Sequence, residues 1–232
     1  MTALILATLA FTGGHLVLSS SWVRDPLVGR IGERPFLGIY SVLMVLAIIW
    51  MVAAYRAAPE IIVWNAPIAV RHITLSAMIF ASILAVGSFS RFNPAIAGMP
   101  PPKLEDGPRG LFRITRHPFN WAVALWAVSH MLANGDAASL VLFGGFAALA
   151  LLGTLHIDIK KRRLLGAPWA AYAAQSSHIP FAAILTGRTR FVWAEIGWMP
   201  PILGLVLYIV LLVLHEPVIG VAPLPQVSGI FP

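Results

Sequence analysis

The 232-residue sequence contains no cysteine and few charged residues. The absence of cysteine excludes disulfide bonds, thiolate metal ligands, iron–sulfur clusters and covalently attached c-type heme. Charged residues make up 11% of the chain, whereas soluble domains carry about a quarter. Only nine residues are acidic, and the net charge is +7. In a chain this apolar, a basic excess is typical of the cytoplasmic loops of membrane proteins, so we expect no nucleic-acid partner.

Long apolar runs dominate the sequence, which is 59% hydrophobic with a mean hydropathy of +0.83. Six runs approach or reach the roughly 17–25 residues that a membrane-spanning helix needs. They are Leu4–Trp22, Leu37–Tyr55, Pro67–Val86, Pro118–Leu132, Ala138–His156 and Gly197–His215. No basic segment or small-residue cleavage site marks the first run as a signal peptide, so we expect a retained span. The sequence predicts an all-α bundle of about six transmembrane helices, with residues 1–232 forming a single domain.

Basic residues gather in alternate connections between the predicted spans. All of the 16 Lys and Arg residues except Arg56 and Arg71 lie in the first, third and fifth connections. Because cytoplasmic loops carry an excess of Lys and Arg, these three connections are expected in the cytoplasm. The protein is therefore predicted to lie in the inner (cytoplasmic) membrane with both termini on the outer side.

Histidines lie within or beside four of the predicted spans, where titratable groups are rare and usually functional. These histidines are His15, His72, His117, His130 and His156. No two stand three or four positions apart and no H-E-x-x-H motif occurs, which argues against a hydrolytic zinc site. Single imidazoles from different helices suit a heme b held between spans. Each can equally well satisfy a backbone carbonyl or anchor at the interface, an interpretation we prefer for His178 and His215.

Charged neighbours of these histidines also have two interpretations. Arg113 and Arg116 precede His117 and can bind an acidic lipid or a heme propionate, or can simply flank a span on the cytoplasmic side. Asp158 follows His156 by two positions and can orient that imidazole or face water.

Several stretches together carry a family resemblance. They are GGHLVLSS in the first span, LFRITRHPFNWAVALWAVSH from Leu111, and SSHIPFAAILTGR from Ser176. The chain from the first span to about Arg190 resembles the NnrU family, which also covers the plastid and cyanobacterial zeta-carotene cis–trans isomerase. RITRHP and IPFAAIL-x-GR are the most specific parts of the match.

The resemblance implies an integral membrane protein that binds heme b. At the positions of the isomerase's iron ligands this sequence has His15 and His130. His72, His117 and His156 fall where the isomerase has further functional histidines, and they are the alternative ligands. Near the second ligand the isomerase has a cysteine, and the corresponding position here is about Ala127, so a thiolate ligand is impossible.

Within this scheme His117 has a role of its own on the cytoplasmic side. It lies thirteen positions before His130, which is about 20 Å along a helix, so the two cannot bind one iron. We expect His117, with Arg113 and Arg116, to contact a propionate or phosphate group.

The family contains two roles, and both remain open. One is cis–trans isomerisation of an apolar, carotenoid-like polyene or a related membrane lipid. The other is a non-enzymatic accessory or maturation role in denitrification, with nitrite and nitric oxide reductases as partners.

A more distant likeness is to membrane methyltransferases of the isoprenylcysteine and phospholipid type. It rests on the RHP turn and on the later L-x-G-x-P-W-x-x-Y stretch from Leu164. Those enzymes use a pair of glutamates before this stretch to hold S-adenosylmethionine, whereas this sequence reads KKRR there. The charge is wrong for the amino group of the cofactor, so this is the least favoured function.

Overall fold

The computed structural model describes residues 1–90, 92–94 and 103–224. In these residues the regular structure is helical, apart from one isolated bridge between Ile62 and Asp136. This confirms the predicted all-α class. Arg91, one of the cations assigned to the cytoplasmic side, lies outside the described residues.

Five helices of the described chain are long and apolar enough to cross a membrane. They are α1 (Thr2–Ser19), α3 (Glu33–Arg56), α4 (Ile68–Gly87), α6 (Ala137–Leu165) and α10 (Met199–Ile219). They correspond to five of the predicted spans. The remaining predicted span is α5 (Pro118–Asn134), a 17-residue helix that begins at the expected proline.

Shorter helices occupy the connections. They are α2 (Ser21–Ile31), α7 (Ala167–Gln175), α8 (Ala182–Leu185), α9 (Trp193–Ile196) and the 3₁₀ turns η1 (Leu104–Asp106) and η2 (Gly110–Arg113). Helix α6 differs most from its predicted bounds, because it continues past His156 through the KKRR run. Lys and Arg are good helix formers and are favourable near the negative end of the helix dipole. The helix ends at Leu165, and the Gly166 that follows it has a φ of +58°.

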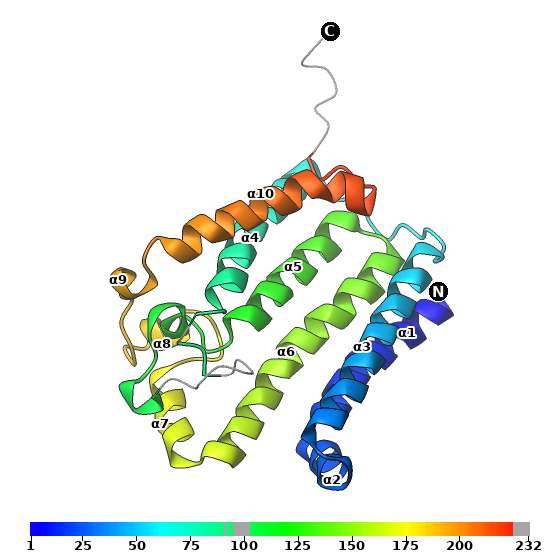
Figure 1. Cartoon of the computed structure of the whole chain (residues 1–232). Coiled ribbons are helices and arrows are strands. Elements are labelled where there is room, and N and C mark those ends of the chain that lie inside the picture. The colour runs from blue at the N-terminus through cyan, green and yellow to red at the C-terminus, as the bar shows by residue number, and fades with distance from the viewer. Residues whose placement is uncertain (91, 95–102, 225–232) are drawn as a thin grey trace.

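The long helices form a layer in which α4, α5 and α6 lie side by side in chain order (Figure 1). Helix α1 packs on α6 and pairs with α3, while α10 packs on α4. The buried core lies mainly among α1, α3, α5 and α6. Helix α10 leaves most of its apolar residues exposed, as expected for a surface that faces lipid.

Glycines permit the closest helix contacts. A Cβ at Gly145 of α6 would collide with the methyl group of Thr8 on α1. A Cβ at Gly204 of α10 would lie 2.6 Å from the Cα of Ile83 on α4. Small residues let membrane helices approach until their backbones nearly touch. These two positions therefore hold α1 and α10 against the central layer.

The turn between α5 and α6 is fixed from both sides. Gly135 adopts a left-handed conformation with φ +71°, and the Asp136 carboxylate accepts a hydrogen bond of 2.8 Å from the backbone N–H of Ser139. The Gly135 carbonyl accepts bonds of 2.9 and 3.0 Å from the backbone N–H groups of Val63 and Trp64. The segment that leads into α4 is thereby attached to the α5–α6 turn.

Candidate functional site

Two segments with specific family motifs meet at the start of α5. The backbone N–H of Arg116 donates to the carbonyl of Ser177 over 2.9 Å, and that of Phe181 donates to Ile114 over 2.8 Å. The carbonyl of His178 accepts bonds of 2.8 Å from Thr115 Oγ1 and from Trp121 Nε1. The RITRHP and SSHIPF stretches therefore form one backbone-linked unit, although about sixty residues separate them.

Asp158 of α6 lies at the centre of a polar cluster beside this unit. Its carboxylate accepts a 2.9 Å bond from His117 Nε2 and further bonds from the Arg116 guanidinium, at 2.9 Å from Nε. The His117 side chain is only 1% exposed. This differs from the two sequence interpretations of Asp158, because the carboxylate neither orients His156 nor simply faces water. His156 instead lies 3.2 Å from Ser19 Oγ through its Nε2.

His178, which we had interpreted as an ordinary loop histidine, completes the cluster. Its ring centroid lies 5.8 Å from that of His117, and its Nε2 lies 3.2 Å from Thr154 Oγ1. Its Nδ1 is buried without a partner. Burial lowers the pKa of His178, and the electrostatic effects of neighbouring His117 and Arg116 lower it further, against a smaller opposing effect of Asp158. The ring is therefore neutral at pH 7.

The nitrogen and oxygen atoms of His117, Asp158 and His178 all lie within 4.8 Å of one another, a spacing that a metal ion could use. The Asp158 carboxylate is, however, already engaged by His117 and by the charged Arg116. A divalent ion would have to compete with that guanidinium at close range. The arrangement favours a hydrogen-bonded ion-pair cluster over a metal centre.

Arg113 is engaged away from this cluster. Its Nε and Nη2 each donate to the Glu195 carboxylate over 2.7 Å, and its Nη1 donates to Thr189 Oγ1 over 2.9 Å. The hydrogen bonds to Glu195 raise the pKa of Arg113, and the same bonds lower the pKa of Glu195. Arg113 thus links η2 to α9, and its donors are occupied by protein groups.

The predicted ligand His15 lies in an aromatic pocket of α1 and α3. Its ring centroid is 4.8 Å from that of Phe11 and 5.5 Å from that of Tyr40, and its Nδ1 is buried without a partner. A Cβ at Gly13 would meet nothing within 4 Å, whereas one at Gly14 would lie 3.0 Å from the Met44 methyl group. There is therefore open space beside Gly13 but not beside Gly14.

The other predicted ligand, His130, is held by its own helix. Its Nδ1 lies 2.7 Å from the carbonyl of Trp126, so Nδ1 carries the proton and Nε2 keeps its lone pair. Its ring centroid lies 5.0 Å from that of Phe143 and 6.4 Å from that of His215 on α10. The sequence interpretation had given His215 no site role.

His15 and His130 are connected through a series of aromatic contacts. Phe11 contacts Phe146 with centroids 5.4 Å apart, and Phe146 contacts Trp126 at 5.1 Å. Trp126 in turn lies 5.5 Å from His130. Among the ring contacts of the described residues, none joins the two histidines directly. His72, an alternative ligand, is exposed on α4.

The fold and these side chains define a multispanning membrane protein with histidines inside and at the ends of its helix layer. A family model described as "NnrU protein" matches residues 3–223. The chain belongs to the NnrU family, as its motifs predicted.

Two curated relatives are chloroplast 15-cis-zeta-carotene isomerases. The chain is 30% identical to the Zea mays protein over 95 residues, which is 41% of this chain and 26% of that protein. It is 31% identical to the Arabidopsis thaliana protein over 93 residues, which is 40% of this chain and 25% of that protein. The chain therefore matches about a quarter of the length of these relatives. No solved structure matches it significantly.

Proposed function

We propose that this chain binds heme b within its helix layer and isomerises a cis double bond in a long conjugated polyene. The family membership and the similarity to 15-cis-zeta-carotene isomerases support the reaction class. The observation that best supports heme binding is the hydrogen bond from His130 Nδ1 to the Trp126 carbonyl. Metal-binding histidines usually donate one ring N–H in this way, which fixes the tautomer and directs the other nitrogen to the metal.

The donor chemistry of the described side chains fits heme b. His130 offers its Nε2, because its Nδ1 donates to the Trp126 carbonyl, and the His15 ring lies in an aromatic pocket where no described side chain bonds to its Nδ1. His15 and His130 would hold the heme, and the contact between Phe146 and Trp126 belongs to the aromatic series that connects them. When bound, the heme would supply reversible one-electron chemistry, which weakens a conjugated double bond long enough for rotation.

The chain's own contribution would be an apolar, dry environment. Trp126 packs edge to face against Phe143 and Phe146, with centroid distances of 5.1 Å to both phenyl rings, and Trp126 and Phe143 contact the His130 ring. A hydrophobic shell around a metal site limits water access and tunes its redox potential. The same rings offer an aromatic surface to an apolar polyene.

Absorption spectroscopy tests the cofactor. The protein should be expressed with added heme precursor, purified in detergent, and measured oxidised and reduced. A Soret band with sharp reduced α and β bands is expected, and His130→Ala should remove it. His72→Ala is the matched control, because His72 is exposed on the neighbouring helix. A featureless visible spectrum of the wild-type protein would refute heme binding.

Activity is tested in a bacterial strain that accumulates 15-cis-zeta-carotene, with the isomers separated by chromatography. Expression of the wild-type chain should increase the share of zeta-carotene whose central double bond is trans, and expression of His130→Ala should not. If the purified protein carries heme but leaves the isomer ratio unchanged, the isomerase proposal fails. The accessory role in denitrification then becomes the better hypothesis.

A further inference from the structure

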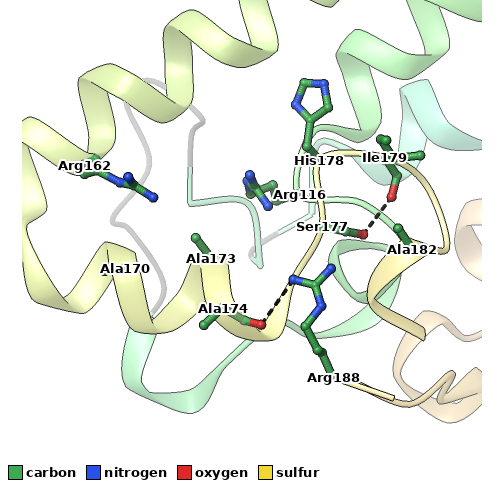
Figure 2. A pocket seen from close by; sticks show the side chains of 10 residues that line it. All are labelled: Arg116, Arg162, Ala170, Ala173, Ala174, Ser177, His178, Ile179, Ala182 and Arg188. Carbon is green, nitrogen blue, oxygen red and sulfur yellow. Dashed lines mark hydrogen bonds between the residues drawn. The ribbon is translucent and has the colours of Figure 1, made fainter. Parts of the chain in front are cut away.

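A second site lies at the other end of the helix layer from His130 and is independent of heme. A pocket of about 450 Å³ opens between the end of α6, helix α7 and the segment that follows it. Arg116, Arg162 and Arg188 line it (Figure 2), and they come from three separate segments. Arg188 ends the IPFAAILTGR motif, and the turn at Gly187, with φ +71°, precedes it.

Each of these arginines retains donors that the described chain does not use. Arg116 gives its Nε and Nη2 to Asp158, which leaves Nη1 unused. Arg188 gives Nη1 to the carbonyl of Ser176 over 3.0 Å and Nε to Thr186 Oγ1 over 3.0 Å, which leaves Nη2 unused. Arg162 forms no hydrogen bond or ion pair with any described residue, so none of these residues uses its guanidinium donors.

The charge balance of the pocket is positive. Three guanidinium groups line it, and the carboxylate bonded to one of them, Asp158, is already shared between Arg116 and His117. Planar guanidinium groups match the oxygens of a phosphate and bind them through paired, charge-assisted hydrogen bonds. The unused donors of the three arginines that line the pocket therefore suit a phosphate group.

The surroundings indicate where that phosphate comes from. The walls are apolar and small, with Ala173, Ala174 and Ala182 among them. Ile179 on the rim is 60% exposed, and nearby Leu185 is 84% exposed. Exposed apolar side chains beside a cluster of cations are typical of the boundary between lipid headgroups and acyl chains. We propose that this pocket binds the phosphate of an anionic membrane phospholipid.

Lipid titration of the full-length protein tests the proposal. The delipidated protein in a neutral detergent is titrated with dioctanoyl phosphatidylglycerol and, separately, with dioctanoylglycerol, which lacks the phosphate. Phosphatidylglycerol should bind and dioctanoylglycerol should not. Arg162→Gln and Arg188→Gln should each weaken the binding about tenfold, because each removes charge-assisted hydrogen bonds to the phosphate.

Arg163→Gln is the matched control. Arg163 neighbours Arg162 on α6 and is also exposed, but it pairs with Asp25 at 2.9 Å and does not line the pocket. This variant removes the same charge and should leave the affinity within about twofold. Because Arg162 makes no bonds within the described chain, Arg162→Gln decides the question even if Arg188→Gln does not fold.

Two results would show that the pocket is not a phosphate site. One is wild-type binding of dioctanoylglycerol as tight as that of phosphatidylglycerol. The other is an equal loss in Arg162→Gln and Arg163→Gln, which would indicate diffuse electrostatic attraction. A further titration with glycerol 3-phosphate separates the two phosphate sources. Binding as tight as that of the lipid would support the phosphate site but overturn its assignment to lipid.

Discussion

The imidazoles of His130 and His215 lie nearly parallel, with ring centroids 6.4 Å apart and planes inclined by 22°. Each has its Nδ1 2.7 Å from a backbone carbonyl, that of Trp126 for His130 and that of Val221 for His215. Both rings therefore keep Nε2 as the nitrogen with a lone pair. His130 thus has an imidazole neighbour on α10, in addition to the aromatic series that leads to His15.

Alanine variants of the three histidines distinguish their roles in heme binding. His130→Ala should yield protein without specific heme. His15→Ala should convert six-coordinate low-spin heme to a five-coordinate form or empty protein, because His15 is the expected second ligand and lies at the other end of the aromatic series from His130. His215→Ala should retain the low-spin bands. Loss of those bands in His215→Ala, together with their retention in His15→Ala, would assign the second ligand to His215 instead.

His117 is expected to matter for stability more than for heme. His117→Ala removes a buried ring that donates to Asp158 over 2.9 Å, and it should lower the free energy of unfolding by about 1–3 kcal/mol. Thermal unfolding in detergent measures this loss, with His72→Ala as the exposed control. The heme bands should stay largely intact, so their disappearance would contradict the structural role of His117.

The ion pair between Arg113 and Glu195 predicts an acid-sensitive connection. Because the pKa of Glu195 is lower in the folded chain than its ordinary value of 4.5, the unfolded chain binds more protons in that range. The contribution to stability is complete above pH 4.5 and is lost as the pH falls through the folded-state pKa. Melting temperatures of the wild-type protein should therefore fall more steeply between pH 5 and pH 3 than those of Glu195→Gln. Parallel curves would contradict this contribution.

The orientation in the membrane remains a prediction with a direct test. All but two of the 16 basic residues lie in alternate connections, which places the C-terminus outside the cytoplasm. A reporter that works only outside the cytoplasm should therefore be active when fused to the C-terminus, and inactive when fused after Gly166, just past the KKRR run. A reporter that works only in the cytoplasm should give the opposite result, and its activity at the C-terminus would reverse the assignment.

The helices could be predicted from the sequence because apolar runs of bilayer length have one stable solution, a helix that satisfies its own backbone. The start of α5 followed from Pro118, which suits a first helical turn. The polar cluster could not be predicted, because Asp158 and His178 reach His117 only after the SSHIPF segment docks on RITRHP. The presence of His178 within a motif of the family resemblance was the signal that could have indicated its place.

Sequence pattern also failed to reveal which nitrogens lack partners. His15 and His178 have buried, unpaired Nδ1 atoms, and both depend on side chains from distant parts of the chain. Its position just before His117 identified Arg116 as a candidate anion contact, but the carboxylate that occupies most of its donors lies on α6. Tertiary packing, and not spacing along the chain, decides which of these groups remains available to a ligand.

The contact between Gly204 and Ile83 gives α10 a fixed pivot on α4. His215 lies about three helical turns further along α10, so a small tilt at the pivot becomes a larger displacement at the imidazole. A methyl group added at Gly204 would therefore push α10 away from α4 and change the position of His215 relative to His130. A screen for altered heme spectra would then recover substitutions of Gly204, which is not an iron ligand, and their effect would reflect helix packing.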